Sequence, residues 1–207
     1  MSSHLVGRIG RIYAAIGEAA TTDLSVLKSV TRRVEGDLYE VSVSFDGGMT
    51  SDQLQNTVYS AVHNVANLRD HLKKWARQNG KRGDVVDRIV DDSLELKVIV
   101  DLSNRDKHGG PDRGGGLSGM SPDLTRFYRA LVIAPQPGRR SAEVVFDFFG
   151  DGPPVQSNDG ARVVISADIV DESVNVVGDA MTFLEAGVSQ WEQALATFGA
   201  VLEPPSA

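Results

Sequence analysis

Apolar residues recur along this chain with two periods, which predict its helices and its strands. Between residues 5 and 16 an apolar side chain appears every three or four positions, the spacing of one helix face. The same spacing at residues 24, 27 and 30 predicts a short second helix. Over residues 37–46 apolar and polar positions alternate one by one, which is typical of a half-buried strand.

The clearest pattern in the chain predicts a pair of long helices. Thr50 and Gln53 have the spacing of a capping box, and an apolar stripe follows until Asn79 and Gly80 end the helix. Asp84 is expected to cap a second long helix, whose apolar stripe continues toward residue 108. The connection between the two helices is short, so we expect them to be antiparallel.

A glycine-rich segment separates this helix pair from a region of strands. Residues 109–122 contain six glycines and predict a flexible loop. Alternating segments around residues 144 and 163–169 predict strands, as does the stretch 175–183, and an apolar stripe then predicts a final helix. We therefore expect a single α+β domain over residues 1–207, comprising a helix pair at about 50–108, the loop at 109–122, and an antiparallel sheet with a helix at 126–199.

The composition is that of a globular protein with no membrane span. Apolar residues make up 41% of the chain and charged residues 24%, which excludes wholesale disorder. No stretch reaches the roughly 18 apolar residues of a membrane helix, and the start of the chain lacks a secretory signal. Cysteine is absent, which fits a reducing compartment. We expect a cytoplasmic protein.

Charge is distributed unevenly along the chain. Residues 1–140 hold 20 of the 21 Lys and Arg against 17 of the 28 Asp and Glu, a net +3. Residues 141–207 hold one basic residue against 11 acidic ones, a net −10. The acidic C-terminal third excludes nucleic-acid binding by the whole surface, and it leaves open a local basic patch, for which residues 69–88 are the main candidate.

The inward stripe of the second long helix becomes polar near its end. Helical projection places Lys97, Asp101, Asn104 and His108 on the arc that apolar residues occupy earlier in the helix. Buried polar groups need partners. In a structural interpretation, Asn104 caps the helix, Asp101 pairs with Arg69 or Lys97, and His108 bonds the last carbonyl groups.

A functional interpretation treats the same helix end as a site. A histidine changes charge near neutral pH, so His108 is suited to proton transfer, while amide and cationic groups around it suit an anion or phosphate. The candidate catalytic residues are Asp101, Asn104, Arg105 and His108, and the candidate binding residues are Arg69, Lys97, Lys107 and Arg113.

Residues 67–76 (NLRDHLKKWA) and 101–109 (DLSNRDKHG) resemble segments of a recurrent family of uncharacterised bacterial proteins of about this length. More distantly, a helix pair that ends in polar residues and a histidine is similar to the HEPN superfamily. Many HEPN proteins are metal-independent ribonucleases of toxin–antitoxin and phage-defence systems, and they act as dimers. In their signature more residues separate the arginine from the histidine than separate Arg105 from His108.

This resemblance implies a homo-oligomeric protein that binds or cleaves RNA, in defence against phage. The alternative is a non-catalytic interaction module, a homodimer in which residues 101–108 form a structural lock. No motif indicates a cofactor, because the glycine-rich loop lacks the Gly-Lys-Ser/Thr ending of a phosphate loop. The four histidines lack metal-binding spacing, and His63 is expected on a solvated helix face, so no metal is expected.

Overall fold

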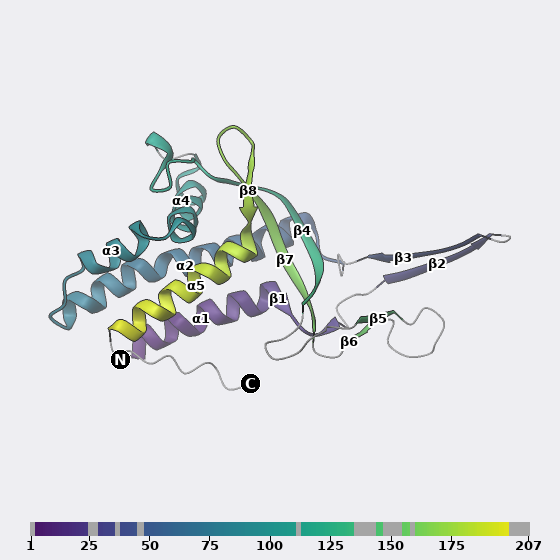
Figure 1. Cartoon of the computed structure of the whole chain (residues 1–207), viewed down its shortest axis with the longest axis horizontal. Helices are drawn as coiled ribbons and strands as arrows, with labels where there is room; N and C mark the ends of the chain where they lie inside the picture. The colour runs from purple at the N-terminus through teal and green to yellow at the C-terminus, as the bar shows by residue number, and fades with distance from the viewer. Residues whose placement is uncertain are drawn as a thin grey trace.

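The structure is a computed structural model, and it confirms the predicted α+β class. Helices α1 (Ser3–Ala19), α2 (Ser51–Gln78) and α5 (Ala180–Thr197) pack side by side, and a small antiparallel sheet stands at one end of them (Figure 1). The structure describes residues 3–24, 29–35, 38–44, 48–110, 113–134, 144–146, 155–157 and 160–198.

The first two of these helices form as their sequences predict. In α1 the apolar positions Leu5, Ile9 and Ile12 are buried against α2, which confirms the amphipathic stripe. At the start of α2 the Gln53 N–H donates to the Thr50 hydroxyl at 3.3 Å, and the Thr50 N–H donates to the Gln53 side chain at 2.8 Å. The capping box is therefore confirmed.

The second predicted helix is divided in two, α3 (Asp84–Asp91) and α4 (Leu94–His108). Between them Ser93 has an extended backbone (φ −118°, ψ 119°), and its hydroxyl accepts the Leu96 N–H at 3.2 Å. The prediction of one continuous helix is wrong, because Ser93 starts a new helix as its N-cap. α3 runs back along α2, whereas α4 is seen nearly end-on in Figure 1 and crosses α2 steeply.

Asp84 is also placed differently from the prediction. Gly83 occupies the N-cap position of α3, where no side chain caps the helix, and Asp84 is the first helical residue. The Asp84 carboxylate accepts hydrogen bonds from Arg82 and Arg88 instead. The turn between α2 and α3 therefore gathers arginines around one acidic group.

The main sheet is antiparallel and centred on one long strand, β7. Its order is β1–β7–β4, and β8 also pairs with β7. The strand predicted over residues 175–183 ends at Asp179, because the Asp179 carboxylate accepts the Thr182 N–H at 2.9 Å and so begins α5. The strands are β1 (Ala20–Thr21), β4 (Asp123–Ile133), β7 (Ala161–Val170) and β8 (Val176–Asp179).

Two short hairpins accompany this sheet, β2 (Ser29–Glu35) with β3 (Leu38–Ser44) and β5 (Val144–Phe146) with β6 (Val155–Ser157). The strand predicted over residues 37–46 is confirmed as β3. The helix predicted through residue 30 is wrong at its end, because Val30 lies in β2 opposite Val43. Its β-branched neighbours favour a strand. Leu27, which this helix prediction also used, lies outside the described residues, as does Phe148 at the end of the strand predicted around residue 144.

Helix α5 closes the core between the helices and the sheet. The Trp191 indole N–H donates to the Val65 carbonyl of α2 at 3.2 Å, and the Trp191 side chain is fully buried. A Cβ on Gly187 would lie 2.7 Å from the Ile99 side chain, so α5 approaches α4 closely at this glycine. Among the described residues, no helix is long and apolar enough to cross a membrane.

Candidate functional site at the end of helix α4

Asp101 joins α4 to the glycine-rich loop. Its side chain is 3% exposed, and its two carboxylate oxygens accept the backbone N–H groups of Leu117 at 2.8 Å and Ser118 at 2.7 Å. The predicted pairing of Asp101 with Arg69 or Lys97 is therefore wrong. Charge-assisted hydrogen bonds from amides compensate the burial of the carboxylate. We name this arrangement the Asp101 lock.

The glycines of the loop allow this lock to form. Gly116 has a left-handed backbone (φ +73°), and a Cβ added there would lie 2.5 Å from the Asp101 carboxylate. Only glycine fits such an approach without displacing the acceptor. The Ser121 N–H donates to the Gly115 carbonyl at 3.0 Å and closes the turn. This part of the predicted flexible loop is thus tied to the helix.

His63 of α2 bridges two residues of α4. Its Nδ1 lies 2.9 Å from the Ser103 hydroxyl, and its Nε2 lies 2.7 Å from an Asp106 carboxylate oxygen. A carboxylate accepts, so Nε2 carries a proton, and in the neutral imidazole Nδ1 accepts the Ser103 hydroxyl proton. The expectation that His63 lies on a purely solvated face is wrong, since its side chain is only 25% exposed.

This Ser–His–Asp arrangement lacks the features of a serine nucleophile. Ser103 is 1% exposed and lies inside α4, where the backbone N–H groups are committed to the helix. The α4 backbone therefore offers Ser103 none of the free N–H groups that stabilise the oxyanion in acyl transfer. The arrangement instead joins α2 to α4 and leaves both ring nitrogens of His63 occupied.

An aromatic contact extends this junction toward the sheet. The Tyr59 ring stacks on His63 with centroids 6.1 Å apart, and Phe127 of β4 lies 6.1 Å from Tyr59 on another side. Burial raises the pKa of Tyr59, and the nearby negative charges of Asp123 and Asp106 raise it further. Tyr59 is therefore neutral at physiological pH and acts as packing for the histidine.

Arg105 and Lys107 also tie α4 to its neighbours. The Arg105 guanidinium lies 2.8 Å from the Asp123 carboxylate at the start of β4. The Lys107 ammonium donates to the Asn67 side chain of α2 at 2.8 Å, although Lys107 itself is exposed. The end of α4 is thus fixed on several sides.

Arg69 contacts α3 and not the residues at the end of α4 with which it was predicted to pair. Its guanidinium donates to Asp87 of α3 at 2.5 and 3.0 Å, and Lys73 lies 2.7 Å from the same carboxylate. Burial opposes ionisation of Asp87, but the hydrogen bonds from Lys73 and Arg69 outweigh it and hold the pKa of Asp87 below its ordinary value. Arg69 therefore serves the α2–α3 contact.

His108 is the last residue of α4, and it is exposed. Within the part of the chain that the structure describes, its imidazole has no hydrogen-bond or ionic partner. The predicted cap of the helix by Asn104 is wrong, because Gly109 ends the helix with a left-handed backbone (φ 68°), and Asn104 is half-buried. Lys97 is half-buried one turn before Asp101, and the side chain of Arg113 lies outside the described residues.

Sequence reasoning missed His63, Ser103 and Asp106 as a connected group. The available signal was weak, because His63 lies at the margin of the apolar arc of α2 and the register of the two helices cannot be read from the sequence. In the described ranges, no group of three or more His, Asp or Glu side chains could hold a metal ion. Comparison with known proteins finds no matching family model, no similar curated protein and no similar solved structure.

Proposed function

We propose that this protein binds RNA and cleaves it without a metal ion, with His108 as the proton-transfer group. The observation that carries this proposal is the exposed His108 imidazole, whose ring nitrogens are unoccupied in the described part of the chain, unlike those of His63. The resemblance to HEPN ribonucleases implies the same activity and a role in phage defence.

RNA suits such a site because it carries its own nucleophile. When a base removes the proton of a 2′-hydroxyl, the 2′-oxygen attacks the adjacent phosphorus and the bond to the 5′-oxygen breaks. The 5′-oxygen takes up a proton from the protonated base or from water, which leaves a 2′,3′-cyclic phosphate and a 5′-hydroxyl. The reaction needs proton transfer and stabilisation of phosphate charge, and a histidine beside cations supplies both. Lys107, in the last turn of α4, is exposed and adds positive charge to this helix end, although its ammonium also donates to Asn67.

The contacts of Asp101, Arg105 and His63 support this site by fixing the end of α4. The Asp101 lock, the His63 bridge and the Arg105–Asp123 ion pair hold the end of α4 against a loop, α2 and β4. Proton transfer depends on placing the imidazole precisely, so a rigid helix end is favourable. We assign Asp101 and His63 as positioning residues and leave proton transfer to His108.

The test is RNA cleavage in EDTA by the wild type and by His108→Ala, with Arg11→Gln, a change at an exposed residue of α1, as the control variant. We expect His108→Ala to lower the rate at least about 100-fold, the usual contribution of a general acid or base. An oligonucleotide with 2′-O-methyl groups should bind without being cleaved. Equal cleavage by His108→Ala and the wild type would show that His108 does not transfer the proton.

A second candidate is a non-catalytic, homodimeric interaction module. It is favoured by the commitment of Asp101, Arg105 and Lys107 to contacts inside the chain, which is what a structural lock requires. This candidate predicts no cleavage of any RNA and a molar mass in solution of twice the 22.2 kDa chain. A monomeric mass would exclude it.

A further inference from the structure

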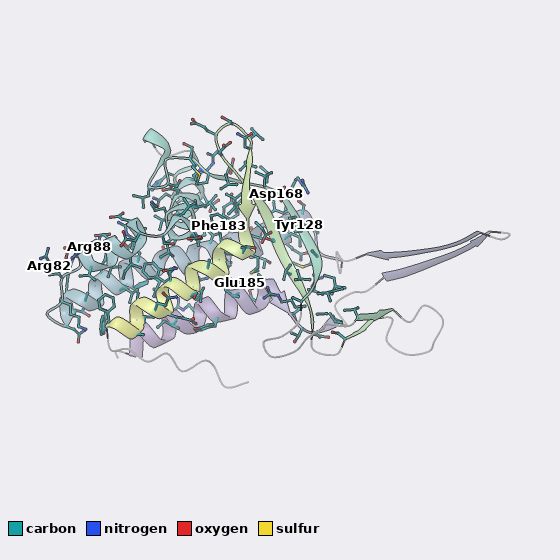
Figure 2. The ribbon with its side chains drawn as sticks, viewed as in Figure 1. Arg82, Arg88, Tyr128, Asp168, Phe183 and Glu185 are labelled. Carbon is teal, nitrogen blue, oxygen red and sulfur yellow. The ribbon has the colours of Figure 1, made fainter. Side chains whose placement is uncertain are left out.

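Exposed cationic side chains surround the turn between α2 and α3, and none of them takes part in the contacts described above for the end of α4. We define the cationic end as Lys74, Arg77, Arg82 and Arg88. All four side chains are exposed, Arg82 to 81% and Arg88 to 64%. Figure 2 shows Arg82 and Arg88 where α2 and α3 meet, at the end of the helices away from the sheet.

Three guanidinium groups lie close together in this turn. Arg82 donates to both Asp84 oxygens at 3.0 and 2.7 Å, and Arg88 donates to the same carboxylate at 3.2 Å. The guanidinium of Arg77 packs over Gly83, where an added Cβ would lie 3.2 Å from its Nε atom. One carboxylate therefore holds two guanidinium groups beside a third, and positive charge remains in excess.

The charge of the surrounding segment supports this excess. Residues 69–88 hold seven basic and three acidic residues, a net +4, whereas the whole chain is −7 and the remainder is therefore −11. A positive region on an otherwise negative protein orients an approaching polyanion toward that region. Guanidinium groups also match phosphate geometry with paired hydrogen bonds.

We propose that the cationic end binds the phosphate backbone of RNA without reading its sequence. This inference rests on the proposed RNA function and divides it in two: affinity comes from the cationic end, and proton transfer takes place at the end of α4. α3 leads from the turn that carries the cationic end to the start of α4 (Figure 1), so α3 joins the two regions along the chain. Aromatic stacking is not needed, because phosphate contacts alone give sequence-independent binding.

The experiment separates these two parts. Binding of a fluorescein-labelled, 2′-O-methylated single-stranded RNA is measured by anisotropy in EDTA over a range of KCl concentrations. The Arg82→Gln/Arg88→Gln variant is compared with Arg11→Gln/Arg126→Gln, which removes the same charge from exposed arginines of α1 and β4. Circular dichroism verifies that each variant is folded.

We expect the cationic-end variant to bind roughly tenfold more weakly and to lose about 1.4 from the slope of log affinity against log salt, because each phosphate contact on a single strand contributes about 0.7. The control pair should bind within about twofold of the wild type, as expected for distant, screened charges. If the variant and the wild type cleave RNA at the same rate when RNA is saturating, the two arginines take part in binding and not in the cleavage step.

The possible failures are distinct. Equal weakening by the two double variants would mean that net charge alone matters, and this inference would fail while the RNA function stands. Binding that depends on the cationic end, with cleavage that survives His108→Ala, supports this inference and removes the proposed role of His108. A wild type that binds no RNA at low salt overturns both proposals.

Discussion

Asp84 lies at the start of α3 and Asp101 in the middle of α4, and the two carboxylates are compensated in different ways. Asp101 is 3% exposed and accepts two backbone amides. The Asp84 side chain is 45% exposed and accepts from two arginines. The hydrogen bonds from Arg82 hold the pKa of Asp84 below its ordinary value, and its exposure leaves those bonds screened by water.

The two regions make different contributions to the protein. Amide donors around a buried acceptor cannot be replaced by water without opening the structure, so the Asp101 region contributes stability. Arginines around an exposed carboxylate can release it and bind water or another anion instead, so we assign the Asp84 region to the binding of anions.

The largest effect is expected from Asp101→Ala. The change removes the buried, charged acceptor of the Leu117 and Ser118 N–H groups, which costs about 2–4 kcal/mol in the free energy of unfolding. Urea denaturation at neutral pH measures it, and Asp84→Ala, whose carboxylate is exposed, should leave the midpoint almost unchanged. If the two variants unfold at the same urea concentration, the contrast between a buried lock and an exposed pair disappears.

Gly116→Ala checks the same lock from the loop side. A Cβ at this position would lie 2.5 Å from the Asp101 carboxylate, whereas at Gly119 (φ +75°) a Cβ would meet nothing within 4 Å. Both alanines adopt an unfavourable left-handed backbone, costing roughly 1–2 kcal/mol. The excess loss in Gly116→Ala therefore reports on the carboxylate itself. Equal losses in the two variants would place Asp101 farther from the loop than the structure does.

Much of the fold could be predicted because its signals are local. The stripe of α1, the capping box of α2 and the alternation of β7 each depend on residues within a few positions of one another. The break at Ser93 was missed because serine fits the helical arc by position. Its hydroxyl caps α4 only when the chain turns there, which depends on how α4 packs across α2.

The candidate site was harder to predict, because the type of a side chain does not reveal which groups will be its hydrogen-bond partners. Asp101 accepts amides of a loop, and any loop residue except proline presents the same N–H group. His63 finds Ser103 and Asp106 only through the crossing of α2 and α4. Helical projection placed Asp101 on the inward face of its helix, where the structure buries it, but its specific partners required the tertiary structure.

A smaller effect is expected at Tyr128, where a third carboxylate lies between the two extremes. Asp179 accepts the Tyr128 hydroxyl at 2.5 Å and the Ser166 hydroxyl at 2.6 Å, and Figure 2 shows Tyr128 on the sheet near the start of α5. Burial, followed by the hydrogen bond to Asp179, raises the pKa of Tyr128 from 10.0 to about 12. Tyr128→Phe removes this bond, at a cost of about 1 kcal/mol near pH 7.

The pH dependence of this loss has a definite sign. Between pH 10 and about 12 the unfolded chain has released the Tyr128 proton and the folded chain retains it, so stability falls as pH rises. The wild type should therefore lose stability more steeply than Tyr128→Phe as the pH rises above 10, in urea denaturation from pH 9 to about 12. Parallel curves for the two proteins would show that Tyr128 does not donate to Asp179.

The smallest effect is expected from Asp84→Asn, which tests directly whether Asp84 affects RNA binding and not stability. Asp84 occupies Arg82 and Arg88 and so competes with phosphate for the same donors. Because the carboxylate is exposed, its loss should not change the urea midpoint, but it should free both guanidinium groups and raise affinity for 2′-O-methylated RNA by roughly two- to fivefold at low salt. The gain should disappear in the Arg82→Gln/Arg88→Gln background, since the freed donors are then absent. Weaker binding by Asp84→Asn would instead mean that the carboxylate is needed to orient the arginines. Asp84 would then have a structural role, as Asp101 does in the Asp101 lock.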